Sequence, residues 1–197
     1  MTSIAYRSKS SAKVGFLADG AAQVSAATHD LGTGMWTVLA IVGAECLGLP
    51  LERIRPVLGD SALPAAPISW GSLSTASVSP AVQRAADSAK KKLIQFAVSD
   101  KKSPFGGMKP EEVSYENGQL VGGGKTADFG SVLNAMGRSS IEATESAEAG
   151  EEKTKYAFHS FGAQFCELRV NQWTNEVRVS RITSVMDAGQ VAVTGRQ

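Results

Sequence analysis

A long stripe of apolar residues in the middle of the chain limits the folds that are open to it. After Ser79-Pro80, apolar side chains recur at the three- and four-residue spacing of one helix face: Val82, Ala85, Ala86, Ala89, Leu93, Phe96 and Ala97. We expect Ser79 to be the N-cap and Pro80 the first helical residue, because both residue types favour those positions. A helix with one apolar face has to pack on another layer of the same domain.

The first sixty residues predict a hairpin, a helix and a further strand. Residues 12–17 and 22–26 read as strands on either side of the turn signal Asp19-Gly20. Residues 35–47 have helical spacing and are closed by Gly48. Residues 54–58 form a predicted strand, and its proline favours the edge of a sheet.

The second half of the chain continues the mixture of strands and helices. Asn117-Gly118 predicts a small type I′ hairpin, and a short helix from Phe129 to Met136 follows it. Residues 139–155 are acidic and poor in large apolar side chains, so we expect a flexible surface connection there. Residues 156–170 and 176–186 then read as two long strands. Because strands and helices do not alternate regularly, we predict an α+β fold in which mixed sheets and hairpins pack with two or three helices.

Composition excludes several classes of function. The 197 residues carry 20 Lys and Arg against 19 Asp and Glu, which argues against a nucleic-acid partner. No apolar run has the length of a membrane span. Cys46 and Cys166 have no metal-ligand spacing, and we expect both to be buried thiols in a reducing compartment.

Two segments with the character of an anion-binding helix start stand out from this background. Asp30-Leu31-Gly32-Thr33-Gly34 runs directly into the first predicted helix, and the serine-rich segment 71–80 opens the long one. Free backbone N–H groups at the start of a helix favour an anion. If both segments face one ligand, they would form a cradle for a phosphate-bearing cofactor. Each segment also has a simpler explanation, since Ser79 can act only as a cap and the glycines can serve only a tight turn.

Four segments, in order, resemble the molybdopterin-binding large subunit of the xanthine dehydrogenase and aldehyde oxidase family, the molybdenum hydroxylases. They are Val14–Gly20 with Asp30–Val38, Leu47–Ile54 with Leu58–Asp60, Gly71–Ala81, and His159–Val170 with Glu176–Val179 and Asp187–Gly189. The resemblance covers most of the chain except residues 100–155. It implies a partial molybdopterin-binding domain over residues 1–197, a C-terminal-region fragment of that large subunit.

The resemblance also implies a set of cofactor-binding residues. Gly32, Thr33 and Gly34 would approach the pterin and its pyrophosphate through backbone N–H groups, since glycines allow close approach. Ser77 and Ser79 would add hydroxyl donors, Ser74 would be a further donor, and Ala76 would leave room near the metal. No protein residue of this chain is expected to bind the metal, because in this family the pterin supplies sulfur ligands.

The departures from the family pattern bear on substrate and catalysis. Thr33 stands where xanthine oxidases commonly have glutamine, and threonine there is similar to the aldehyde-oxidising bacterial branch. Asp187-Ala188-Gly189 is not followed by the usual Asn-Pro, so Gln197 is only a candidate for the family's cofactor-contacting glutamine. The glutamate that serves as general base in the family has no counterpart here. We therefore assign no catalytic residue and expect the isolated chain to be inactive.

The expected cofactor is molybdenum-molybdopterin, with the cytosine dinucleotide form as one alternative. The expected partners are the rest of the large subunit, iron–sulfur and FAD subunits or domains, and a small aldehyde or N-heterocycle substrate. We expect a cytoplasmic protein, or a periplasmic one if a partner carries the export signal. A different hypothesis is a non-catalytic module that binds a pterin or a nucleotide, or an assembly subunit. His29 and His159 fall in separate motifs, and we expect structural roles for both.

Overall fold

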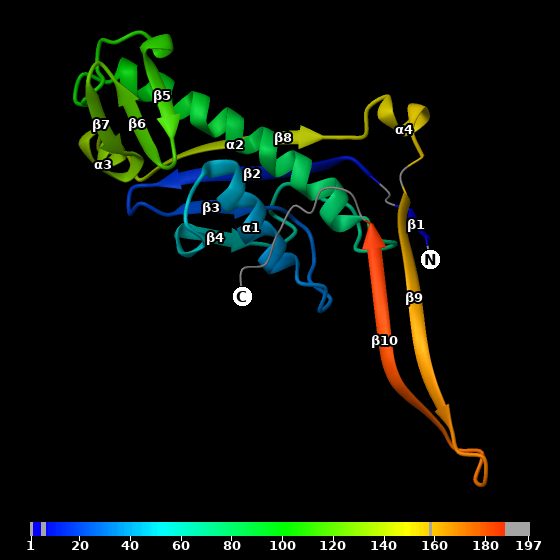
Figure 1. The fold of residues 1–197 in the computed structure, drawn as a ribbon. Coiled ribbons are helices and arrows are strands. Elements are labelled where there is room, and N and C mark those ends of the chain that lie inside the picture. Colours follow the sequence, from blue (N-terminus) through cyan, green and yellow to red (C-terminus); the bar gives the residue numbers. More distant parts are fainter. Residues whose placement is uncertain (1, 5–6, 158, 188–197) are drawn as a thin grey trace. The chain divides into compact units, whose positions relative to one another are not determined.

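The computed structural model describes residues 2–4, 7–157 and 159–187 of the 197-residue chain. Ala188, Gly189 and Gln197 of the sequence analysis lie outside these residues. The chain separates into two compact units: residues 6–150 form the larger, and residues 1–5 with 151–197 form the smaller. Figure 1 shows the elements of both units. The fold is α+β, as predicted from the sequence.

A four-stranded sheet organises the larger unit. Its strands are β2 (Ser10–Leu17), β3 (Ala22–Ser25), β4 (Ile54–Val57) and β8 (Ser140–Ala147), in the order β4-β3-β2-β8. β2 and β3 form the predicted antiparallel hairpin, in which Phe16 lies opposite Ala22. β4 runs parallel to β3 at the edge of the sheet, the position that its proline favours.

Two helices cover one face of this sheet. α1 (Met35–Leu47) packs on β3 and β4, α2 (Ser74–Ser99) packs on β2 and β8, and the two helices contact each other. α1 has the predicted bounds, and Gly48 closes it in the left-handed conformation with φ 60°. The apolar face of α2 supplies much of the buried core, including Val82, Ala85 and Leu93, which have no exposed surface.

The predicted start of the long helix is wrong. α2 begins at Ser74, so Ser79 is not an N-cap and Pro80 lies within the helix. Ser-Pro often begins a helix, and the prediction relied on that preference. In the structure, however, the buried face of α2 already includes Ser77 and Val78, which precede this dipeptide. The helix therefore extends through Pro80 even though proline lacks a backbone N–H.

The predicted flexible connection over 139–155 is also wrong in its first half. Ser140–Ala147 is β8, which pairs antiparallel with all of β2. Ile141, Ala143 and Ala147 are buried, Glu142, Thr144 and Ser146 between them are exposed, and Glu145 is half-buried. A strand that buries alanine rather than large apolar residues has the composition of a loop, and period-two alternation is the only signal that distinguishes it. A short helix, α4 (Glu152–Lys155), follows.

A small three-stranded sheet completes the larger unit. It consists of β5 (Val113–Glu116), β6 (Gln119–Gly122) and β7 (Lys125–Asp128), and α3 (Phe129–Ala135) follows directly. Asn117 and Gly118 both have positive φ, 48° and 86°, as the predicted type I′ turn requires. Short 3₁₀ turns, η1 (Leu51–Arg53) and η2 (Pro110–Glu112), precede β4 and β5.

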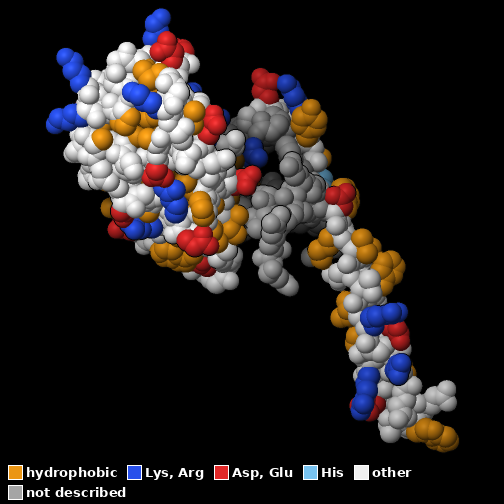
Figure 2. Space-filling model, turned by 60° about the vertical axis from the view of Figure 1, so that its left-hand side comes forward, with side chains coloured by type: hydrophobic (Ala, Val, Ile, Leu, Met, Phe, Trp, Pro, Cys, Tyr) orange, Lys and Arg blue, Asp and Glu red, His pale blue; other side chains and the backbone are white. Residues whose placement is uncertain are grey.

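The smaller unit is a long antiparallel hairpin with a third short strand. β9 (His159–Val170) pairs with β10 (Val177–Asp187), and β1 (Thr2–Ile4) pairs with the start of β9. The two long strands confirm the sequence prediction. Hydrophobic side chains are exposed along the hairpin (Figure 2), among them Phe165 and Ile182. Cys166 is exposed here, so the prediction that both cysteines are buried is wrong for this one.

Candidate functional site

The loop that enters α1 is held by a single carboxylate. Oδ1 of Asp30 accepts hydrogen bonds from the backbone N–H groups of Gly32, Thr33 and Gly34 at 2.9, 2.9 and 3.1 Å. Oδ2 of Asp30 accepts one from the N–H of Trp36 at 3.2 Å. The N–H of Trp36, followed by those of the glycine turn, lowers the pKa of Asp30 below its usual value of 3.8. The anion position at the start of α1 is therefore filled by the protein itself.

Gly32 and Gly34 give this loop its shape. Their φ angles are 84° and 80°, a left-handed conformation that glycine adopts without a steric penalty. A Cβ placed on either glycine would meet no atom within 4 Å, so open space adjoins both. The glycines therefore serve a turn and also leave room beside it.

The start of α2 differs from that of α1. Within the part of the chain that the structure describes, no side chain caps this helix: its N-cap is Leu73, which carries no hydrogen-bonding group. The first N–H groups of a helix have no acceptor within that helix, and they carry partial positive charge. The first turn of α2 is thus available to a negatively charged or hydrogen-bond-accepting ligand.

Hydrogen bonds through Ser69 connect the two helix starts. Nδ1 of His29 lies 3.0 Å from Oγ of Ser69, and that hydroxyl donates to the carbonyl of His29 at 3.3 Å. Ser74, the first residue of α2, donates its hydroxyl to Ser69 at 3.3 Å. The hydroxyl of Thr75 donates to the sulfur of Met35, at 3.6 Å. The predicted approach of the two motifs in space is therefore present in the fold.

A cavity of about 420 Å³ lies where the two helix starts meet. It is lined by the loop before α1, the loop before α2 and the first residues of both helices: Leu31, Thr33, Met35, Ser69, Trp70, Gly71, Ser72, Leu73, Ser74 and Thr75. The volume lies in the range of small-molecule sites. Hydroxyl groups and apolar side chains dominate the lining, and no charged side chain is among them.

The structure separates the predicted site residues into two groups. Thr33 and Ser74 line the cavity, and Gly32 and Gly34 flank Thr33 in the same turn. Ala76, Ser77 and Ser79 are not in its lining. Ser77 is buried, and its Oγ accepts a hydrogen bond from the N–H of Ser8 at 2.9 Å. Ala76 and Ser79 are half-buried within α2.

Sequence reasoning missed several cavity residues as ligand contacts. Ser69, Ser72 and Thr75 add hydroxyl groups, and Trp70 adds an aromatic ring that is 65 % exposed. A predicted helix start at Ser74 instead of Ser79 would have pointed to these residues, because the donors of an anion site lie around the first turn of a helix.

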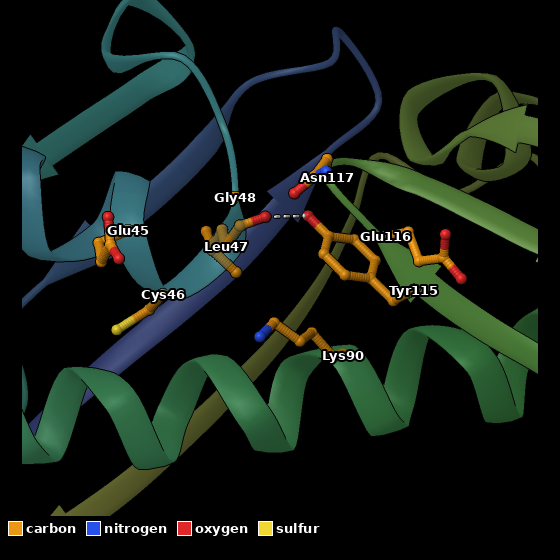
Figure 3. Close-up of a pocket in the computed structure, with 8 residues that line it drawn as sticks. All are labelled: Glu45, Cys46, Leu47, Gly48, Lys90, Tyr115, Glu116 and Asn117. Atoms are coloured by element: carbon orange, nitrogen blue, oxygen red, sulfur yellow. Dashed lines mark hydrogen bonds between the residues drawn. The ribbon is translucent and has the colours of Figure 1, made fainter.

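A second cavity, of about 360 Å³, lies at the other end of α1 (Figure 3). It is lined by the C-terminal residues of α1, by Lys90 of α2 and by the end of β5 with its turn. Glu45 and Glu116 place two carboxylates in its lining, which disfavours a phosphate. Tyr115 donates its hydroxyl to the carbonyl of Leu47 at 2.9 Å, and burial raises the pKa values of Tyr115 and Cys46. These are packed structural groups.

Among the described residues, no group of three or more His, Cys, Asp or Glu side chains could hold a metal ion. His29 takes part in the hydrogen bonds around Ser69, and His159 lies with its ring 6.4 Å from that of Phe161. No helix within the described ranges has both the length and the apolar character needed to cross a membrane.

Comparison with known proteins identifies the domain. The family model of the molybdopterin cofactor-binding domain matches residues 1–192. The aldehyde oxidoreductase molybdenum-binding subunit PaoC of Escherichia coli (strain K12) is 34 % identical over 187 residues, which cover 93 % of this chain and 23 % of PaoC. The chain thus spans about a quarter of the length of that relative.

Solved structures share the fold. Quinoline 2-oxidoreductase of Pseudomonas putida 86 superposes with a TM-score of 0.73 and 18 % identity, over 96 % of this chain and 26 % of that protein. Reconstituted CO dehydrogenase of Oligotropha carboxidovorans gives a TM-score of 0.70 and 19 % identity, over 91 % of this chain and 22 % of that protein. The family match, the relative and the shared fold agree: the chain belongs to the family of molybdopterin cofactor-binding domains.

Proposed function

We propose that the cavity between the starts of α1 and α2 is this chain's part of a molybdenum-molybdopterin pocket. The observation that carries the proposal is that one cavity joins the glycine turn at Thr33 to the uncapped first turn of α2 at Ser74. The family match to a molybdopterin cofactor-binding domain supports the same ligand.

The residues present fit such a group. Phosphate is well held by preorganised backbone N–H groups and neutral hydroxyls at a helix start. Ser74 and Thr75 supply both at α2, and Ser72 adds a hydroxyl from the loop before it. Thr33 contributes a hydroxyl from the opposite wall, and Gly32 and Gly34 keep the space beside it open. Ala76, Ser77 and Ser79 do not line the cavity, and they would support it indirectly as neighbours of Ser74 and Thr75 in α2.

Trp70 gives the cavity an aromatic wall beside these polar groups. An exposed indole offers a flat apolar surface on which the pterin ring can pack, while its phosphate end is held at α2. The ligand would therefore be oriented by chemistry at both ends. The cytosine dinucleotide form is one candidate for the bound cofactor.

We infer that the complete protein is an oxidoreductase of the molybdenum hydroxylase class. When bound, molybdenum-molybdopterin would supply the redox chemistry that oxidises a carbon centre of an aldehyde or N-heterocycle. Thr33 in the glycine turn and the name of the PaoC relative favour an aldehyde. This chain would bind and orient the cofactor, and the catalytic base, the iron–sulfur and FAD groups and the rest of the large subunit would lie outside it. The isolated chain would be inactive, and a cytoplasmic location suits the whole protein.

Fluorescence of Trp70 tests cofactor binding directly. In a chain with Trp36→Phe and Trp173→Phe, Trp70 is the one remaining tryptophan. Molybdopterin released anaerobically from a molybdenum hydroxylase should quench its emission in a saturable way. Thr33→Val and Ser74→Ala should each weaken the affinity by about tenfold, because each removes a hydrogen bond to the cofactor.

Cys46→Ala provides the matched control, because it alters the second cavity and leaves the first intact. It should leave the titration unchanged. Quenching that never saturates, or an equal loss of affinity in the Cys46 variant, would contradict the proposal.

A further inference from the structure

We propose that Asp30 is a positioning residue of the cofactor site, which fills the anion position of α1 so that the cofactor's phosphate goes to α2. The inference rests on the proposed function and refines it. It replaces the expectation that the backbone N–H groups of Gly32, Thr33 and Gly34 bind the pyrophosphate.

A single side chain, the carboxylate of Asp30, binds the turn that precedes α1. The carboxylate of Asp30 accepts from the N–H groups of Gly32, Thr33, Gly34 and Trp36, at distances between 2.9 and 3.2 Å. These are the N–H groups that a phosphate at the start of α1 would need. A second anion at this position would have to displace a carboxylate that the chain itself holds in place.

The starts of α1 and α2 differ in how they are capped. α1 is closed by a charged side chain, whereas α2 begins without a side-chain cap at Leu73. Both starts line the same cavity, through Thr33 and Met35 on one side and Ser74 and Thr75 on the other. A dianionic group that enters the cavity therefore meets repulsion from Asp30 near α1, and at α2 it meets helix-start N–H groups that no side chain of the described residues caps. This asymmetry fixes the direction in which the cofactor lies.

The hydrogen bonds to Asp30 also determine where the side chain of Thr33 lies. The turn that carries Thr33 has left-handed glycines on both sides and no neighbour within 4 Å of where their Cβ atoms would be. Packing therefore does little to fix this turn, and its shape depends on the hydrogen bonds to Asp30. Without them, the hydroxyl of Thr33 would no longer be held at the cavity wall.

The test combines amide signals with cofactor affinity in the full-length chain. In the wild-type protein, the amides of Gly32, Thr33 and Gly34 should be protected from solvent exchange, and inorganic phosphate should not shift their NMR signals. In Asp30→Ala these amides should lose protection, and added phosphate should shift their signals and restore protection, because it replaces the lost carboxylate. A general loss of stability would not produce this rescue by an anion.

Molybdopterin affinity supplies the second measurement. Asp30→Ala should weaken binding by about tenfold, since the freed turn has to be ordered again. Asp30→Asn, which keeps an oxygen acceptor for the turn, should stay within about threefold of the wild type. Asp60→Ala is the matched control, because Asp60 also caps its own turn, through the N–H of Ala62, but lies outside the cavity lining.

The outcomes separate this inference from the proposed function. If the wild-type chain takes up no molybdopterin, the proposed function fails and the inference falls with it. If the wild-type chain binds and Asp30→Ala binds as tightly or more tightly, only the inference is overturned, because the N–H groups of α1 would then be the phosphate site. Phosphate-induced shifts at Gly32 to Gly34 in the wild type would overturn it as well.

Discussion

Asp30 carries a negative charge at the end of a helix that attracts one, and this affects stability as well as binding. Its pKa is lowered in the folded state by four backbone N–H groups. A carboxyl whose folded pKa lies below its unfolded value stabilises the fold above the unfolded pKa. That stabilisation is lost as the pH falls through the folded pKa.

The stability difference between the wild type and Asp30→Asn should therefore shrink as the pH falls from about 5 to about 2. Urea denaturation at a series of pH values measures this difference. A difference that stays constant across the range would mean that the carboxylate is not held in the folded state as described.

Ser77 and Ser79 lie two residues apart in α2 and should respond differently to the same substitution. Ser77→Ala should destabilise the protein by about 1 kcal/mol, because it leaves the part-buried N–H of Ser8 without its acceptor. Ser79→Ala should change stability by less than about 0.5 kcal/mol, because Ser79 lies within the helix and alanine favours that position. If Ser79 were an N-cap, its loss would cost about 1 kcal/mol. Chemical denaturation of both variants distinguishes these outcomes.

Only part of the residue-scale site could be predicted from sequence. Thr33 and Ser74, which the family resemblance implies as cofactor contacts, both line the cavity, and glycines and hydroxyl residues before a helix are a local signal of the same kind. Ser77 is also a hydroxyl residue near the helix start, but it is buried. Its burial could not be predicted from the spacing, because the predicted helix start was wrong. The four hydrogen bonds by which Asp30 closes α1 depend on the left-handed conformation of Gly32 and Gly34 beside it.

At the scale of elements, α1 lies close to the sheet through a glycine. A Cβ on Gly43 would come within 2.7 Å of Cγ2 of Val24 and 3.3 Å of Cγ2 of Ile54. Gly43→Ala should therefore destabilise the protein by about 1 kcal/mol or more, although alanine favours a helix. Thr37→Ala, at an exposed position of the same helix, is the control and should be neutral or stabilising. Thermal unfolding measures both, and stabilisation by Gly43→Ala would show that α1 is not packed this closely.

The elements that were predicted correctly have strong local signals. α1 has helical spacing and a terminal glycine, and the turn at Asn117-Gly118 has the residues that a type I′ conformation requires. β8 has no such signal. It is a strand because β2 offers it a partner along its whole length, and this partner lies more than a hundred residues earlier in the chain.

At the scale of the whole molecule, the buried core lies within one unit. Among the residues that the structure describes, every buried hydrophobic residue of the core belongs to the segment from Ala12 to Ala147. We therefore expect residues 6–150 to fold alone, with a cooperative thermal transition within about 4 °C of that of the full chain, since no core contact is removed. Circular dichroism measures the transition. A fragment without a cooperative transition would show that the hairpin unit is needed for folding.

NMR mapping of molybdopterin binding tests the central claim most directly, because it distinguishes binding at the first cavity from binding at the second. When the isotopically labelled chain is titrated with molybdopterin, the signals of Thr33, Ser74, Thr75 and the Trp70 indole should shift together and saturate. The signals of Cys46, Tyr115 and Asn117, which line the second cavity, should stay unchanged. Shifts confined to the second cavity, or no saturable shift at the first, would contradict the assignment of the cofactor site.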